Sequence, residues 1–137
     1  MLNAGVIEKF EVSTKWNTKT FPVPKQDGTS CRVVGDWRGV NSIFRTLLHH
    51  TESCDQLLRH VASDSKVFAV IDAASGYHQL RVSEESQEFL TIVTKMGRFT
   101  FKCLPQGIAS AASLWNILID GNSRIDSTLN LIKNMDD

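Results

Sequence analysis

The sequence predicts an α+β fold, in which strands and helices are mixed without a regular strand–helix alternation. Short runs of strand-forming residues flank Gly28, and similar runs flank Gly97. Apolar residues recur at helical spacing over Ala111–Asp120. No internal repeat and no Pro/Gly/Ser-rich linker divides the 137 residues, so we expect one structural unit.

The composition is that of an ordinary globular protein. With 42% hydrophobic residues, 22% charged residues and a formal net charge of zero, the chain is neither a disordered protein nor a simple basic nucleic-acid coat. No apolar run approaches the ~20 residues that span a bilayer, and the first residues lack the layout of a secretory signal. Three scattered cysteines do not make a disulfide framework. We therefore expect an intracellular, cytoplasmic location, no secretion and no membrane partner.

The first half of the chain contains a predicted hairpin with arms Phe21–Lys25 and Cys31–Asp36. Asp27-Gly28 between them is a strong turn signal, because glycine supplies the positive φ that a tight hairpin turn needs. Pro22 and Pro24 lack amide donors, so this arm is expected at a sheet edge. Farther along, Ser53 is expected to cap a helix that runs to about residue 62.

The second half begins with the dense apolar run Lys66–Asp72, which predicts a strand buried on both faces. A strand is expected to resume over His78–Val82, and Ser83 is expected to begin a helix with acids in its first turn. Leu90–Thr94 and Arg98–Cys103 predict a second hairpin. A loop at 104–107, a helix over 111–120 and a last strand over 129–135 complete the prediction.

Three carboxylates follow predicted strands. Asp72 ends the central apolar run, and Asp136 and Asp137 end the chain. Two carboxylates ~4 Å apart repel by about 4 kcal/mol at an effective dielectric near 20, and bound divalent cations relieve that repulsion. Two metals would clamp the attacking and leaving oxygens of a phosphoryl transfer. On spacing alone, the alternative is a solvated strand-end acid and a solvated terminus, and such acids are common.

Four segments together resemble the reverse transcriptases of gypsy-like LTR retrotransposons and retroviruses. VIDAASGYHQL, which contains Asp72 and Tyr77, resembles their first catalytic motif, and the segment Lys25–Asn41 resembles their fingers segment. VSEESQEFLTIVTKMGRFTFKCLPQGI resembles the stretch that leads into their L-P-x-G loop, and NMDD occupies the place of their Y-x-D-D box. The resemblance covers about residues 5–137 and keeps the family's order and spacing.

The resemblance implies a fingers-and-palm fold, with an antiparallel palm sheet packed on helices and truncated at the catalytic hairpin. Residues 1–65 would be mostly fingers, 83–103 a second fingers segment, and 66–82 with 104–137 the palm. The implied activity is RNA-directed DNA polymerisation, a two-metal nucleotidyl transfer from a deoxynucleoside triphosphate to a primer 3′ end. The implied partners are an RNA or DNA template-primer and the rest of a pol polyprotein (thumb and ribonuclease H), in a virus-like particle.

The resemblance also implies roles for individual residues. Asp72, Asp136 and Asp137 match the catalytic carboxylates that hold two magnesium ions, or manganese. Lys25 and Arg32 match the basic pair that closes on the incoming triphosphate. Two further residues match nucleotide-contacting positions, the aromatic ring beneath the incoming sugar and the polar residue of the L-P-x-G loop: Tyr77 and Gln106. Four matches are expected to be scaffold or template contacts: Asp36, Trp37, Arg38 and Asn41.

The chain differs from the family pattern in ways that keep a second hypothesis open. Asn134 stands where the family usually has the aromatic residue of the Y-x-D-D box, and the thumb and ribonuclease H regions do not follow. We therefore expect that this piece alone does not polymerise. The alternative is a catalytically inactive remnant that keeps the palm fold and acts at most as a nucleic-acid-binding module.

Overall fold

The computed structural model describes residues 1–26, 28–50, 53–59 and 66–122, and the statements below concern these residues. Strands and helices are mixed along the chain, so the predicted α+β class is confirmed. The elements in chain order are β1 (Ile7–Lys9), β2 (Thr18–Pro24), β3 (Cys31–Gly35), α1 (Arg38–Asn41), α2 (Cys54–Arg59), the 3₁₀ helix η1 (Gly76–Gln79), α3 (Glu84–Gln87), the 3₁₀ helix η2 (Glu88–Leu90), β4 (Thr91–Thr94), β5 (Gly97–Phe101) and α4 (Ala111–Asn122).

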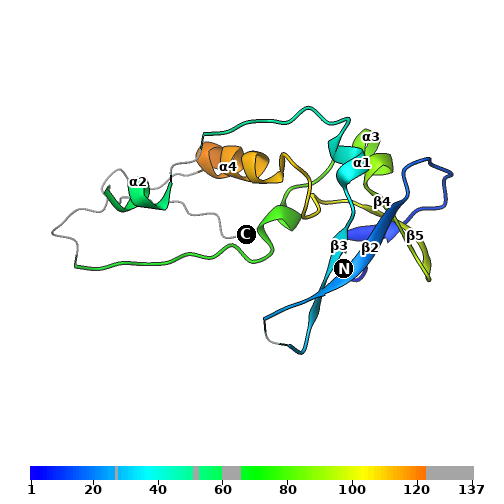
Figure 1. Cartoon of the computed structure of the whole chain (residues 1–137), viewed down its shortest axis with the longest axis horizontal. Helices are drawn as coiled ribbons and strands as arrows, with labels where there is room; N and C mark the ends of the chain where they lie inside the picture. Colours follow the sequence, from blue (N-terminus) through cyan, green and yellow to red (C-terminus); the bar gives the residue numbers. More distant parts are fainter. Residues whose placement is uncertain (27, 51–52, 60–65, 123–137) are drawn as a thin grey trace.

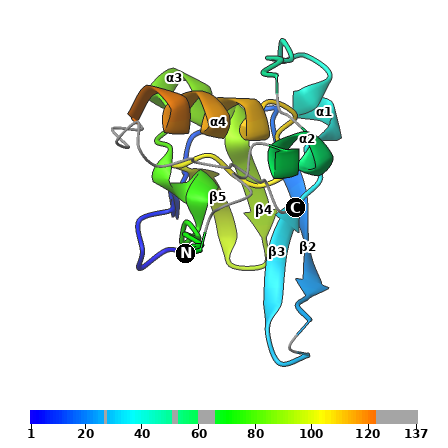
Figure 2. The same cartoon turned by 90° about the vertical axis from the view of Figure 1, so that its left-hand side faces the viewer.

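One five-stranded sheet organises the described residues, with the strand order β1-β5-β4-β2-β3. The pairs β1–β5, β4–β5 and β2–β3 are antiparallel, whereas β2 and β4 run parallel where Thr18 faces Ile92. Figure 1 shows the sheet at one end of the molecule, and both Figure 1 and Figure 2 show the β2–β3 hairpin projecting from it. The helix α2 lies at the opposite end in Figure 1.

The β2–β3 hairpin confirms the first predicted hairpin, although β2 begins at Thr18 rather than Phe21. Only the first two residues of β2 pair with β4, and the rest of the strand pairs with β3 alone. Pro22 and Pro24 lie in this outer part, opposite Val33 and Cys31. On the side of β2 away from β3, the two prolines therefore have no paired strand that would need their amide donors. This agrees with the prediction that the arm lies at a sheet edge.

The β4–β5 hairpin confirms the second predicted hairpin, and Gly97 takes a φ of +120° in its turn. These strands carry much of the core, because Ile92, Phe99 and Phe101 are all buried. The rest of the core comes from residues outside the strands: Trp37, Val40, Leu90, Leu104, Ile108 and Ala111. None of the helices in the described ranges combines the length and apolarity needed to cross a membrane.

The predicted helices are present. Ser53 begins α2 with a capping box, in which its amide donates to the Gln56 side chain (2.9 Å) and the Gln56 amide donates to its hydroxyl (3.4 Å). The predicted end near residue 62 lies outside the described residues. Ser83 precedes α3, with Glu84 and Glu85 in the first turn as expected. The helix α4 covers the predicted range and extends to Asn122.

The prediction of a buried strand over Lys66–Asp72 is wrong for the described structure. The segment has no strand assignment, and Val70 and Phe68 are 96% and 70% exposed. Figure 1 shows it as a long extended path that runs from the side of the molecule where α2 lies toward η1, away from the sheet. A strand needs a neighbour for its backbone donors and acceptors, and the sheet formed by the described residues offers it none. The strand predicted at 129–135 lies outside the described residues.

The predicted strand over His78–Val82 is also wrong. The chain instead forms η1, which follows Ser75 at a φ of 53°, and only a single antiparallel bridge joins Arg81 to Cys103. Tyr77 on η1 packs edge-on against Trp115 of α4, with ring centroids 6.5 Å apart. This packing turns the chain toward the helix and leaves too few extended residues for a strand.

Candidate nucleotide site

The loop after β5 carries Gln106 at an exposed position between buried neighbours. Leu104 and Pro105 are buried on one side of it, and Ile108 is buried on the other. Gly107 has a φ of +94°, a conformation that residues with a Cβ rarely adopt. A Cβ at this position would also lie 2.9 Å from Cδ1 of Trp37, so the backbone rests directly on the indole. The loop thus presents Gln106 to solvent from a fixed base.

Asn41, the last residue of α1, holds this loop through both ends of its carboxamide. Its Nδ2 donates to the carbonyl of Gly107 (2.9 Å), and its Oδ1 accepts from the amide of Ala109 (3.0 Å). The Asn41 backbone is itself fixed, because its amide donates to the carbonyl of Trp37 (2.8 Å). The segment that follows the β2–β3 hairpin is therefore hydrogen-bonded to the loop on both sides of Ile108, beginning at Gly107, the residue next to Gln106.

Trp37 fills the space between two glycines. It is 3% exposed, and its ring packs edge-on against Phe101 at a centroid distance of 5.8 Å. A Cβ at Gly35 would lie 2.6 Å from its ring, and a Cβ at Gly107 would also meet it. Of the four residues expected to be scaffold or template contacts, Trp37 is thus part of the core.

Asp36 and Arg38 flank Trp37 and pair with each other on the surface. Arg38 donates through Nε (2.8 Å) and Nη2 (2.7 Å) to the two carboxylate oxygens of Asp36. These hydrogen bonds, followed by one from the Arg38 amide, lower the pKa of Asp36 to about 2. The pair orients the Arg38 guanidinium at the entrance to α1.

We expect Arg38→Ala to return the pKa of Asp36 from about 2 toward its ordinary value of 3.8, because the largest cause of the shift is removed. A carboxyl whose pKa is lowered by folding stabilises the fold at pH values above its pKa in the unfolded chain. This contribution is lost as the pH falls through its pKa in the folded chain. The Arg38→Ala variant should therefore lose the contribution of Asp36 to the pH dependence of stability between pH 3.8 and about 2. An NMR titration of the Asp36 carboxyl carbon measures the pKa, and an unchanged value in the variant would contradict the assignment.

Lys25 and Arg32 both lie on the projecting hairpin and are exposed. Lys25 directly follows β2, and its amide donates to the carbonyl of Ser30 (2.9 Å) across the turn. Arg32 faces Val23 in the β2–β3 register. The structure thus brings the predicted basic pair together on one hairpin, whereas Gln106 belongs to a different loop.

Tyr77 is half-buried, because its ring packs against Trp115 and against the edge of the core. Gly76 beside it is also close to Trp115, since a Cβ there would lie 3.1 Å from the indole. The neighbouring His78 is partly buried, and this burial lowers the pKa of its imidazole. Tyr77 therefore has a packing role, and its predicted contact with the nucleotide stays a prediction.

Asp72 is exposed at the end of the extended segment, ahead of η1. Its two expected partners, Asp136 and Asp137, lie outside the described residues, so their convergence stays a prediction. Within the described ranges, no group of three or more His, Cys, Asp or Glu side chains could hold a metal ion. Exposed carboxylate oxygens are nevertheless the donors that magnesium prefers, so the chemistry of the predicted set fits this ion.

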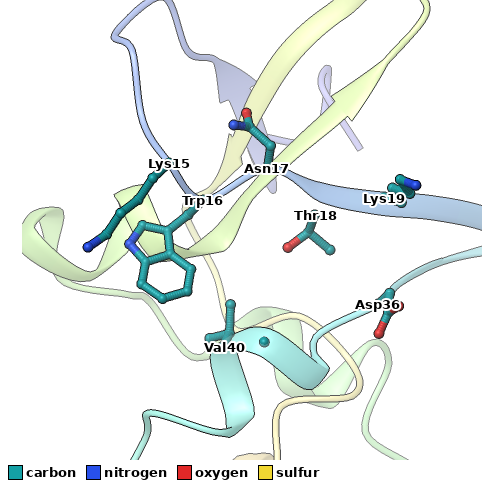
Figure 3. Close-up of a pocket in the computed structure, with 8 residues that line it drawn as sticks. Lys15, Trp16, Asn17, Thr18, Lys19, Asp36 and Val40 are labelled. Atoms are coloured by element: carbon teal, nitrogen blue, oxygen red, sulfur yellow. The ribbon is translucent and has the colours of Figure 1, made fainter.

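A pocket of about 330 Å³ lies at the base of the hairpin. Figure 3 shows the residues from Lys15 to Lys19 along one side of it, with Asp36 and Val40 of the segment after β3 facing them. The ammonium of Lys15 lies 5.5 Å from the centroid of the Trp16 ring. Among the residues that the structure describes, the pocket lining includes neither Gln106 nor any other predicted catalytic or nucleotide-binding residue.

The sequence model of one protein family, described as "Reverse transcriptase (RNA-dependent DNA polymerase)", matches residues 23–137. The chain belongs to the reverse transcriptase family. It is 32% identical over 115 residues to the retrovirus-related Pol polyprotein from transposon 297 of Drosophila melanogaster, covering 81% of this chain and 11% of that protein. It is 25% identical to the Gag-Pol polyprotein of walleye dermal sarcoma virus, covering 83% of this chain and 6% of that protein. The chain thus spans about a tenth or less of these relatives.

Solved structures show the same fold for this reverse transcriptase chain. The crystal structure of the native prototype foamy virus protease-reverse transcriptase matches with a TM-score of 0.71 and 24% identity, covering 88% of this chain and 16% of that one. The foamy viral protease-reverse transcriptase in complex with dsDNA matches with a TM-score of 0.70 and 23% identity, covering 89% of this chain and 25% of that one.

Two contacts of the reverse transcriptase loop were not predicted from the sequence. The carboxamide clamp of Asn41 is one, although the motif had marked this residue as scaffold. Ser110 is the other, because its buried hydroxyl accepts from the amide of Leu47 (3.0 Å) and fixes the segment after α1. Nothing in the local sequence around Ser110 indicates this bond, since its partner lies 63 positions away.

Proposed function

We propose that this chain is part of an RNA-directed DNA polymerase, which transfers nucleotides from deoxynucleoside triphosphates to the 3′ end of a primer. The observation that carries the proposal is the match of the reverse transcriptase family to residues 23–137, a range that contains every predicted site residue. The exposed position of Gln106 on a firmly held loop supports it, because a nucleotide contact must be both accessible and fixed.

Three carboxylates and four nucleotide-binding side chains would carry this activity. Asp72, Asp136 and Asp137 would hold magnesium or manganese, which supplies electrostatic stabilisation of the attacking and leaving oxygens. The four side chains would bind the triphosphate, the sugar and the base: Lys25, Arg32, Tyr77 and Gln106. Phosphoryl transfer depends mainly on positioning and electrostatics, so no nucleophilic side chain is required of the protein.

The proposed partners are an RNA or DNA template-primer and the further regions of a pol polyprotein, with thumb and ribonuclease H. The foamy viral protease-reverse transcriptase solved in complex with dsDNA supports the first of these. In this arrangement residues 1–65 and 83–103 would be fingers, and residues 66–82 and 104–137 would be palm. We place the activity inside the cell, in the particles of the parent element.

Primer extension tests the proposal. A polypeptide that carries this chain together with the thumb sequence of its gene should extend a DNA primer on an RNA template when magnesium and deoxynucleoside triphosphates are present. Extension should stop when the metal is removed with a chelator and resume when magnesium is restored. A protein that binds template-primer without extending it would instead support the catalytically inactive remnant, which the Asn134 departure favours.

Tyr77→Ala should weaken the discrimination against ribonucleotides, because a rigid ring beneath the sugar rejects a 2′-hydroxyl by collision. We expect the ratio of deoxynucleotide to ribonucleotide incorporation to fall by about tenfold or more. Tyr77→Phe keeps the ring and its packing against Trp115, so it should keep the wild-type ratio. If Tyr77→Ala lowered stability but left the ratio unchanged, the tyrosine would have a packing role alone.

A further inference from the structure

The hydrogen bonds of Asn41 connect the fingers hairpin to the loop that carries Gln106. The strand β3 ends at Gly35, and α1 follows it within three residues and ends at Asn41. Asn41 is then bonded to Gly107 and Ala109 across 66 and 68 positions of sequence. We propose that Asn41 is a positioning residue, which sets nucleotide affinity by holding Gln106 in its binding geometry; this inference rests on the proposed function.

The anchor on the hairpin side is rigid. Val40, next to Asn41, is 2% exposed, and Trp37 one turn earlier is 3% exposed. The amides of Asn41 and Phe44 donate to the carbonyls of Trp37 and Val40. The carboxamide of Asn41 thus projects from a short helix whose inner face is fixed in the core.

The loop side depends on this anchor. Gln106 is exposed, so the backbone on either side of it determines where its side chain can reach. Gly107, which follows it, has a positive φ, and glycine can adopt several other backbone conformations as readily. The bonds from Asn41 hold the carbonyl on one side of Ile108 and the amide on the other, and they thereby restrict this glycine.

A carboxamide is suited to this task because it offers one donor and one acceptor in a plane. The carbonyl of Gly107 needs the donor, and the amide of Ala109 needs the acceptor. Aspartate has nearly the same shape, but its carboxylate would set a second acceptor against the Gly107 carbonyl. If the side chain at position 41 only fills space, aspartate can replace asparagine. If it must donate one hydrogen bond and accept the other, aspartate cannot replace it.

Kinetics of single-nucleotide incorporation by the polymerase test the inference. Asn41→Ala should raise KM for the deoxynucleotide by about tenfold, the effect of about two ordinary hydrogen bonds, with kcat within about twofold of wild type. Asn41→Asp should raise KM at least as much. When Gln106 is already alanine, Asn41→Ala should change KM by less than about twofold, because the two residues act through one contact.

Asn17→Ala is the matched control, since the Asn17 side chain also donates to a backbone carbonyl (Thr14, 2.8 Å), but this carbonyl does not belong to the loop of Gln106. It should leave KM unchanged. Equal effects of Asn41→Ala in the wild-type and Gln106→Ala backgrounds would overturn the inference, and so would wild-type KM in Asn41→Asp.

Hydrogen exchange of the Ala109 amide in this chain separates the inference from the proposed function. Exchange should be about tenfold faster in Asn41→Ala and unchanged in Asn17→Ala. Unchanged exchange in Asn41→Ala would overturn the clamp even in an active polymerase. If the wild-type polymerase extended no primer, the nucleotide role would fail with the proposed function, and faster exchange would still establish that Asn41 holds the loop.

Discussion

Asp72→Asn is expected to abolish primer extension, with a loss of at least about a hundredfold to a thousandfold in kcat. Asparagine keeps the shape of the side chain but removes the charge that a divalent cation requires. Asp72 is exposed, and substitutions of exposed side chains usually change the free energy of unfolding by less than about 0.5 kcal/mol. The variant should therefore keep the thermal stability of the wild type while it loses catalysis.

Asp55→Asn provides the matched control for this experiment, because Asp55 is an exposed acid on α2 with no predicted metal role. It should extend primers at the wild-type rate. Higher magnesium or manganese concentration should restore part of the Asp72→Asn activity if the defect is in metal binding. Extension by Asp72→Asn at the wild-type rate would show that this carboxylate is not a metal ligand.

The two hairpins and α4 could be predicted because their signals are local. Gly28 and Gly97 both have positive φ at the turns, which glycine adopts without strain. The start of α2 is equally local, since Ser53 and Gln56 form the capping box by themselves. Such signals act within a few residues, so the rest of the fold does not change them.

The two wrong strands depend on contacts that are distant in sequence. Val67 and Ile71 are apolar enough for a buried strand, but they remain 87% and 86% exposed because no described strand lies beside them. An apolar run predicts that a segment can be buried, and it does not specify what covers it. At 78–82 the packing of Tyr77 against Trp115 replaced the extended conformation, and this contact joins two separate elements.

In the candidate site, too, local sequence signals could be predicted and contacts between distant residues could not. Resemblance to the family's motifs identified Gln106 and Asn41, and the structure adds how they are connected. The bond between Asn41 and Gly107 spans 66 positions, so no periodicity or composition could have indicated it. The need for glycine at position 107 also depends on a distant residue, because a Cβ there would lie 2.9 Å from the indole of Trp37.

Trp37→Ala is expected to give the largest loss of stability, about 3–5 kcal/mol, through the cavity left by a buried aromatic ring. Domains of this size are stable by only about 5–15 kcal/mol, so much of the folding free energy would be lost. Phe68→Ala is the control, since it also removes an aromatic ring but from a side chain that is 70% exposed. It should change the free energy of unfolding, measured in urea, by less than about 0.5 kcal/mol.

The loss in Trp37→Ala should reach the loop of Gln106 as well as the core. The indole supports Gly35 on one side and Gly107 on the other, and the amide of Asn41 donates a hydrogen bond to the carbonyl of Trp37. At temperatures where the variant is still folded, exchange of the Ala109 amide should therefore be faster than in wild type. A variant as stable as Phe68→Ala would mean that Trp37 is not the support of this loop, and Asn41 alone would have to hold it.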